Sequence, residues 1–139
     1  MKRESDVRHI ILASHHRFAA GLADTIEFLG GPTDMDVICA YVDETPLEDQ
    51  VAEVFAKFDP ADEVLVFTDI LQGSVNQRFA PYVGEHVFLI AGANVALTLE
   101  LALAAEPLTC EGIEAARQLA RQSMCLINTF QADVDDEDE

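Results

Sequence analysis

The chain has 139 residues, about the size of one ordinary domain, and 50% of them are apolar, which is enough for a sizeable core. Its 26 acidic residues outnumber 8 lysines and arginines, for a formal net charge of −18. Such a surface argues against nucleic acid or an anionic membrane as a partner and favours protein partners. No apolar stretch approaches the roughly eighteen residues that span a bilayer, so we expect a cytoplasmic protein without direct membrane insertion.

The acidic residues concentrate at the end of the chain, where six of the residues 133–139 are acidic. We therefore expect residues 132–139 to be a disordered tail and residues 1–131 to form a single domain. Three cysteines are too few and too scattered for a disulfide framework or a zinc site, and we expect no metal and no cofactor. Cys39 and Cys125 lie in apolar runs and are predicted to be buried.

Short apolar runs alternate with segments of helical period, the pattern of β-α units that feed a parallel sheet. In chain order, the sequence predicts a strand over Val7–Ala13, a helix over Arg17–Leu29, a strand over Asp36–Val42, a helix over Pro46–Phe58, a strand over Glu63–Asp69, a short helix over Ser74–Pro81, a strand over His86–Gly92, helices over Asn94–Glu106 and Glu111–Ser123, and a last strand over Met124–Phe130. Ser74 and Asn94 are predicted N-caps. The expected fold is a three-layer α/β/α sandwich with a mostly parallel central sheet.

Polar residues follow the predicted strands at their carboxyl ends. His15 and His16 follow the first strand, Asp69 ends the third, and Gly73 and Ser74 lie in the next loop. Because the carboxyl ends of parallel strands share one edge of the sheet, these groups are expected to converge.

This combination suits phosphoryl transfer through a histidine. A carboxylate bonded to one ring nitrogen fixes the tautomer, which leaves the other nitrogen as the nucleophile. Amides at a helix N-terminus and a serine hydroxyl can hold the anionic phosphoryl group. The chain has neither a Walker-type loop nor a G-x-G-x-x-G motif, which argues against a nucleotide site.

Each of these residues also has a purely structural interpretation. Asp69 could cap a turn and Ser74 a helix, while a histidine at a strand end is more often structural than catalytic. Adjacent histidines point in different directions, so at most one should face the site. A metal site using His15 and His16 remains a distant alternative, since the histidines lack i, i+4 spacing.

Three motifs occur in order along the chain. The first is "ASHHRFAAGL" (13–22), an apolar strand end followed by histidine and a helix start. The second, "TDILQGSVNQ" (68–77), contains Asp69, Gly73, Ser74 and Asn76. The third, "GANVALTLE" (92–100), contains Asn94.

Together, these motifs resemble the IIA domain of the mannose-type (mannose, fructose, sorbose) sugar phosphotransferase system and the related subunit of dihydroxyacetone kinases. The resemblance implies that His15 accepts a phosphoryl group from the histidine-containing phosphocarrier protein and passes it to a IIB component. It implies that Asp69 orients the imidazole and that Ser74 helps to hold the phosphoryl group, with Gly73, Asn76 and Asn94 completing the cradle. It also implies a homodimer, in which the last strand pairs with the partner subunit.

The sequence departs from the family pattern at positions around the same site. His16 and Gln72 stand where the family has glycine, and Val75 and Ala96 where it has proline. A side chain at position 16 could modulate the approach of a partner protein. The sequence therefore leaves open a second function, a divergent, non-catalytic regulatory or protein-interaction module with the same fold.

Overall fold

The computed structural model describes residues 7–130, and the predicted acidic tail lies outside them. Four strands form one all-parallel sheet in the order β2-β1-β3-β4. They are β1 (Arg8–His15), β2 (Asp36–Ala40), β3 (Glu63–Thr68) and β4 (Val87–Ala91). Four of the five predicted strands are thereby confirmed, with their ends shifted by at most two residues.

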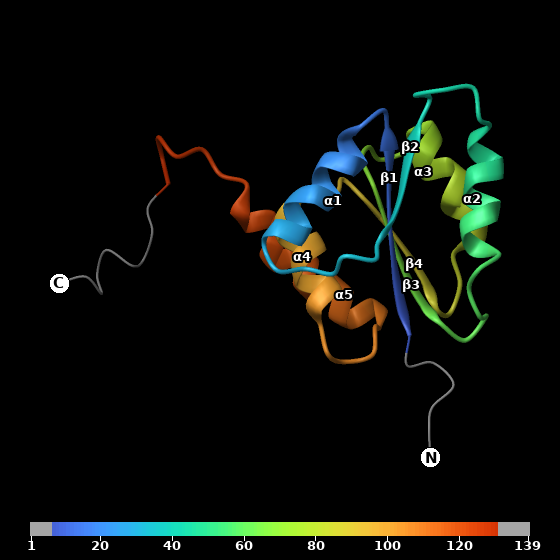
Figure 1. The fold of residues 1–139 in the computed structure, drawn as a ribbon. Coiled ribbons are helices and arrows are strands. Elements are labelled where there is room, and N and C mark those ends of the chain that lie inside the picture. Colours follow the sequence, from blue (N-terminus) through green and yellow to red (C-terminus); the bar gives the residue numbers. More distant parts are fainter. Residues whose placement is uncertain (1–6, 131–139) are drawn as a thin grey trace, which may run out of the picture.

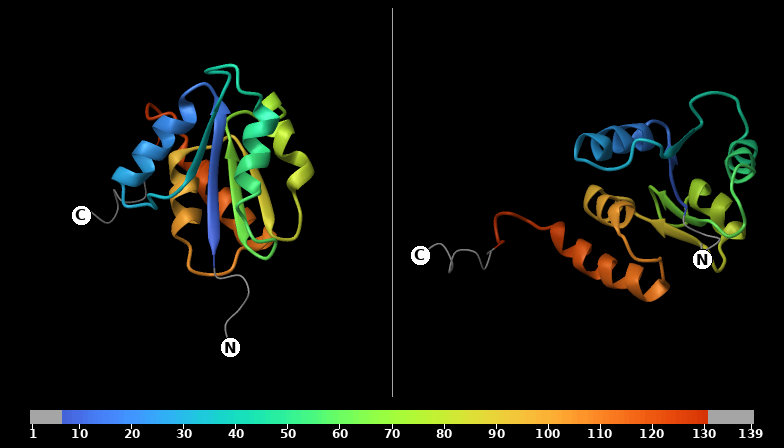
Figure 2. Two further views of the ribbon diagram at one scale, coloured as in Figure 1. Left: turned by 45° about the vertical axis from the view of Figure 1, so that its right-hand side comes forward. Right: turned by 60° about the horizontal axis from the view of Figure 1, so that its bottom comes forward.

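Helices cover both faces of the sheet, as the sequence predicts (Figure 1). One face carries α1 (Phe18–Phe28), α4 (Val95–Leu103) and α5 (Cys110–Ala120). The other carries α2 (Leu47–Phe55) and α3 (Ser74–Phe79), which continues into the 3₁₀ turn η1 (Ala80–Tyr82). A second 3₁₀ turn, η2 (Arg121–Ser123), follows α5, and the three layers separate clearly in the turned views (Figure 2). No helix within residues 7–130 is both long and apolar enough to cross a bilayer.

Two buried clusters hold the layers together, one on each face of the sheet. Because side chains alternate along a strand, Ile10 and Leu12 of β1 face α1, while Ile11 and Ala13 face α2 and α3. Strand β3 alternates in the same way. The middle of each central strand, residues 10–13 of β1 and 64–67 of β3, is therefore apolar on both faces, as expected for a parallel sheet covered on both sides.

The predicted strand over Met124–Phe130 is wrong for the single chain. These residues leave α5 away from the sheet and form a turn, in which the Thr129 N–H donates to the Leu126 carbonyl at 3.1 Å (Figure 1). A strand is stabilised by backbone bonds to a neighbouring strand, and within residues 7–130 this segment pairs with none. Cys125 lies in the same segment and is exposed, so its predicted burial is also wrong, while Cys39 on β2 is half-buried.

Candidate functional site

His15 and Asp69 meet at the carboxyl edge of the two central strands. His15 is the last residue of β1, and Asp69 directly follows β3, whose Thr68 pairs with Ala13. One carboxylate oxygen, Oδ2 of Asp69, lies 2.9 Å from the His15 backbone nitrogen and 2.9 Å from the ring Nδ1. The predicted juxtaposition of imidazole and carboxylate is present.

The Asp69 carboxylate is mostly buried, with 13% of its side chain exposed. Burial by itself raises the pKa of Asp69, but the hydrogen bonds from the His15 backbone and ring, together with its own backbone N–H, outweigh it and lower the pKa. The other oxygen, Oδ1, is buried and has no hydrogen-bond partner among the described residues. Among the described residues, His15 is therefore the one other residue that donates hydrogen bonds to this ionised carboxylate.

The contact with Asp69 determines which nitrogen of His15 is free to react. Nδ1 donates its hydrogen to the carboxylate, so Nε2 carries the lone pair. The His15 side chain is 36% exposed, which leaves Nε2 open to an incoming group. An oriented imidazole with one accessible basic nitrogen is suited to nucleophilic attack on phosphorus.

Gly73 and Ser74 close the other side of the imidazole. Ser74 Oγ lies 3.4 Å from Nε2, within reach of a weak hydrogen bond. A Cβ placed on Gly73 would lie 3.3 Å from Cε1 of His15, so the backbone approaches the ring closely here. Ser74 is the first residue of α3, and Gly73 takes the N-cap position without a side-chain cap, so the prediction that Ser74 caps this helix is wrong. Its hydroxyl is directed to the site instead.

The turn that carries the two histidines is stabilised by hydrogen bonds of Ser14, which is fully buried. Its Oγ accepts the Ala19 N–H at 2.8 Å and donates to the His16 carbonyl at 3.0 Å. His16 adopts φ 53°, a left-handed conformation that favours glycine, and its N–H donates to the Ala40 carbonyl at 2.9 Å. Its side chain is exposed, so only one of the two histidines faces Asp69, as predicted.

Gln72 shares this backbone feature, with φ 65°. Both positions where the family motif has glycine therefore keep the conformation that glycine supplies, at a strain cost of about 1 kcal/mol each. The substitutions place side chains around the site where glycine would have none.

Sequence reasoning missed Tyr41, which directly follows β2. Its hydroxyl lies 2.6 Å from Ser74 Oγ, and its ring is tilted by 46° to the His15 ring at a centroid distance of 5.6 Å. Its backbone is also left-handed, with φ 72°. The signal in the sequence was its position at the carboxyl end of β2, which neighbours β1. There, we expected it to be one of the last residues of an apolar strand.

The side chains of Asn76 and Asn94 form hydrogen bonds away from His15. The Asn76 amide donates to Thr68 Oγ1 at 2.9 Å, which ties α3 to the end of β3 behind the site. Asn94 Oδ1 accepts the Leu97 N–H at 2.9 Å, which confirms its predicted N-cap on α4. Their contribution to a phosphoryl cradle stays a prediction.

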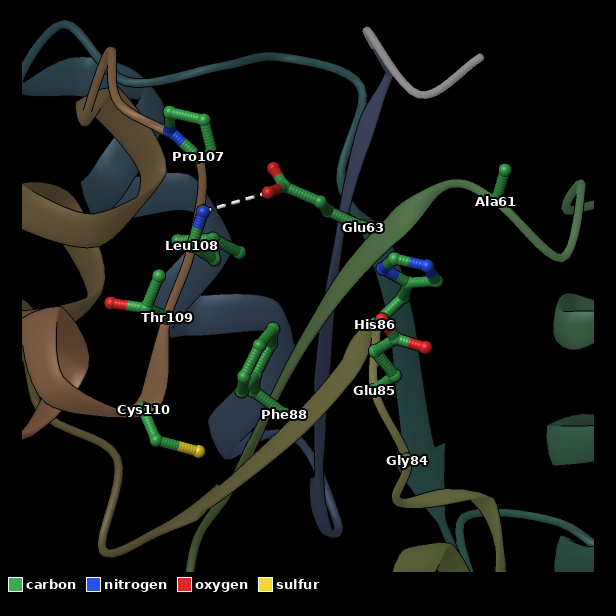
Figure 3. A pocket seen from close by; sticks show the side chains of 10 residues that line it. All are labelled: Ala61, Glu63, Gly84, Glu85, His86, Phe88, Pro107, Leu108, Thr109 and Cys110. Atoms are coloured by element: carbon green, nitrogen blue, oxygen red, sulfur yellow. Dashed lines mark hydrogen bonds between the residues drawn. The ribbon is translucent and has the colours of Figure 1, made fainter. Parts of the chain in front are cut away.

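A separate groove of about 610 Å³ lies at the opposite, amino-terminal edge of the sheet (Figure 3). It runs between the start of β4 and the loop before α5, and is lined by Glu63, His86, Phe88, Leu108 and Cys110. Glu63 is engaged there by the Leu108 N–H at 2.7 Å. Within residues 7–130, no group of three or more His, Cys, Asp or Glu side chains is arranged to hold a metal ion.

The family of the chain follows from a match over most of its length. Residues 9–118 match the family described as PTS system fructose IIA component. The chain belongs to this IIA family. The match contains His15 and Asp69 together with all of α3.

Solved structures agree with this assignment. The chain is similar, with 38% identity and a TM-score of 0.83, to a Klebsiella pneumoniae protein described as a phosphoenolpyruvate-dependent sugar phosphotransferase system permease, over 93% of this chain and 97% of that one. It is similar to a IIA protein associated with the fucose utilization operon of Streptococcus pneumoniae (25% identity, TM-score 0.68, 91% and 97% covered). The mannose/sorbose-specific IIA subunit from Enterococcus faecalis shares the IIA fold (18% identity, TM-score 0.75, 91% and 98% covered). A search of the curated proteins found no match.

Proposed function

We propose that this chain is a phosphocarrier of a sugar phosphotransferase system, with His15 as the residue that carries the phosphoryl group. The observation that supports it most is the double contact of Asp69 Oδ2 with the backbone and ring of His15. That contact holds the imidazole in one tautomer and one orientation, with Nε2 open. The family match and the 38% identical relative from a sugar phosphotransferase system support the same function.

In the proposed reaction, Nε2 of His15 attacks the phosphorus of a phosphohistidine on the phosphocarrier protein. The new N–P bond forms as the donor's N–P bond breaks, and the donor imidazole leaves with its electron pair. The proton on Nδ1 stays in the bond to Asp69, whose negative charge balances the charge that develops on the ring. The IIB component then takes the phosphoryl group by the reverse chemistry, and both exchanges take place between proteins of the cytoplasm.

The test is phosphorylation by the proteins of the system. Incubation with phosphoenolpyruvate, enzyme I and the histidine-containing phosphocarrier protein should label the chain with an acid-labile, alkali-stable phosphoryl group. The label should be absent in His15→Ala and present in the His86→Ala control, whose histidine lies at the opposite edge of the sheet. A wild-type chain that takes no label, or label that survives in His15→Ala, would contradict the proposal and leave the regulatory interaction module as its alternative.

The proposal includes a homodimer in which the segment Met124–Phe130 pairs with the partner subunit. Four large apolar side chains of this segment are exposed: Met124, Leu126, Ile127 and Phe130. Within the described part of the chain, β4 is an edge strand of the four-stranded sheet and its outer side is unpaired. In the proposed dimer, the exposed apolar segment of one subunit pairs with the open sheet edge of the other.

A further inference from the structure

We propose that Tyr41 is a positioning residue that orients the Ser74 hydroxyl toward Nε2 of His15. The inference rests on the proposed function, since it assigns Tyr41 a part in phosphoryl transfer at the same site. Three contacts carry it. Tyr41 Oη lies 2.6 Å from Ser74 Oγ, Ser74 Oγ lies 3.4 Å from Nε2, and Nδ1 lies 2.9 Å from the Asp69 carboxylate.

The direction of these hydrogen bonds follows from the Asp69 end of the chain. An ionised carboxylate only accepts, so Nδ1 donates to it and Nε2 is left as an acceptor. The group facing Nε2 must then donate, and that group is the Ser74 hydroxyl. Ser74 has one hydrogen, so the short contact with Tyr41 has the phenol as donor and Ser74 Oγ as acceptor. Hydrogen bonds aligned in one direction polarise one another.

Without the phenol, no other hydrogen bond within residues 7–130 would orient the Ser74 hydroxyl toward the imidazole. Ser74 is exposed, and its side chain does not cap α3. The serine hydroxyl rotates freely about one bond, and water competes for its hydrogen. Tyr41 occupies the acceptor side of Oγ, so the hydrogen is directed to His15. The same hydrogen is placed for a phosphoryl oxygen once Nε2 carries the group.

The backbone around Tyr41 is built to hold this geometry. The preceding carbonyl, that of Ala40, accepts the His16 N–H at 2.9 Å, which ties the end of β2 to the turn that carries His15. Tyr41 itself is held at φ 72°, a left-handed conformation that is strained for a residue with a Cβ. Strain of this kind persists where the surrounding structure enforces it, often at functional sites.

The inference is tested with a small chemical donor, so that it does not depend on any partner protein. With phosphoramidate, Nε2 of His15 attacks phosphorus, the N–P bond of the reagent breaks, and ammonia leaves after taking up a proton from water. Tyr41→Phe keeps the ring and removes only the hydroxyl. Loss of one oriented hydrogen bond should lower the rate of His15 phosphorylation about 3- to 10-fold. The matched control is Tyr82→Phe, whose ring stacks on Phe55 at 4.1 Å on the α2 and α3 side.

A double-mutant cycle separates positioning through Ser74 from any other role. If Tyr41 acts through the serine, Tyr41→Phe should slow phosphorylation in the wild-type background and change nothing further in Ser74→Ala. Equal rates for Tyr41→Phe and the wild type would overturn the inference. An equal loss in both backgrounds would overturn it as well, because Tyr41 would then act independently of Ser74.

A structural role is excluded by two further measurements on the unphosphorylated protein. The thermal midpoint of Tyr41→Phe should equal that of the wild type. The ¹⁵N resonance of His15 Nε2 should move in Tyr41→Phe and stay unchanged in Tyr82→Phe, because only the first removes the hydroxyl that directs the serine hydrogen toward Nε2. Phosphorylation of the wild type by phosphoramidate but not by the phosphocarrier protein would contradict the proposed function alone. An Nε2 resonance that does not respond to Tyr41→Phe would contradict the inference alone.

Discussion

A single oxygen of Asp69 accepts two hydrogens from His15, one from the backbone N–H and one from the ring Nδ1–H, each at 2.9 Å. The backbone bond anchors the carboxylate to the end of β1, and the ring bond orients the imidazole relative to that anchor. The two bonds therefore fix the direction of Nε2 relative to the sheet, so that the imidazole does not rotate as a free side chain would.

We expect Asp69→Asn to slow phosphorylation of His15 by roughly 10- to 100-fold, because a hydrogen bond to a charged group is worth about 1.5–3 kcal/mol. The amide keeps the size of the side chain but loses the charge that opposes the positive ring. Initial rates with phosphoenolpyruvate, enzyme I and the phosphocarrier protein measure the effect. Asp36→Asn is the control, since its carboxylate pairs with Lys57 at 2.7 Å. Equal slowing in both variants would refute a specific role for Asp69.

The lowered pKa of Asp69 makes a contribution to stability that depends on pH. The fold favours the ionised carboxylate, so the contribution is complete above the ordinary pKa of 3.8 and is lost as the pH falls through the lower folded value. The gap in unfolding free energy between the wild type and Asp69→Asn should therefore be widest near neutral pH and shrink below about pH 4. Urea unfolding at pH 7 and at pH 3 measures this gap. The Thr45 N–H also lowers the pKa of Asp43, but Asp43 is present in both proteins, so its contribution cancels from the difference in unfolding free energy. A gap that widens in acid would contradict the prediction.

Gly73→Ala should slow phosphorylation severalfold while changing the unfolding free energy by less than about 1 kcal/mol. Alanine tolerates the backbone of residue 73, at φ −73° and ψ 167°, but its Cβ would lie 3.3 Å from Cε1 of His15 and press on the ring. Gly84→Ala is the control, because the nearest atom to its Cβ would be 4.0 Å away. Phosphorylation rates and thermal midpoints of both variants are the measurements, and an unaffected rate in Gly73→Ala would show that the ring has room to move.

His16→Gly should leave phosphorylation of His15 intact and change the unfolding free energy by less than about 1 kcal/mol. Relief of the left-handed strain at φ 53° gains about 1 kcal/mol, and the greater freedom of unfolded glycine costs nearly as much. His16→Val should be distinctly less stable, because a β-branched residue is an outlier at positive φ. Denaturant unfolding of the two variants tests this order. Equal stabilities would mean that the turn does not hold the left-handed conformation in solution.

Ile127→Ser should convert the proposed dimer to a monomer. Ile127 is 73% exposed in the single chain, and a polar side chain there removes apolar area from the proposed exchange. Phe28→Ser is the control, since Phe28 is 87% exposed on α1, outside this segment. Light scattering coupled to size-exclusion chromatography measures the mass. A wild-type monomer, or a dimer that survives Ile127→Ser unchanged, would contradict pairing through this segment.

Much of the fold could be predicted because the β-α alternation is strong and local. The middle residues of β1 and β3 are continuously apolar, which indicates strands covered on both faces. The last segment, Met124–Phe130, is also largely apolar but pairs with no strand within residues 7–130, and composition does not tell the two situations apart. Cys125 was misplaced for the same reason.

The site could be predicted in part. His15 and Asp69 were identified because parallel strands end at a common edge, so position in sequence predicts position in space. Tyr41 was missed because an aromatic residue at the end of an apolar strand is indistinguishable from a core residue until its backbone direction is known. Ser74 was correctly predicted to lie at the site, but its predicted hydrogen bond to the start of α3 was wrong. A serine caps a helix only when it precedes the helix with extended dihedral angles, and here Gly73 takes that position.

By itself, the sequence determined the α/β class, the order of the layers and the imidazole, carboxylate and serine at one edge of the sheet, because these depend on periodicities that the chain carries locally. Only the tertiary structure decided which nitrogen of His15 is free, since that depends on the register that places Asp69 Oδ2 against both the backbone and the ring. It also decided the direction of Tyr41, through a left-handed residue at the end of β2. Hydrogen bonds are sensitive to tenths of an ångström, and distances of that order between segments far apart in sequence arise only from packing.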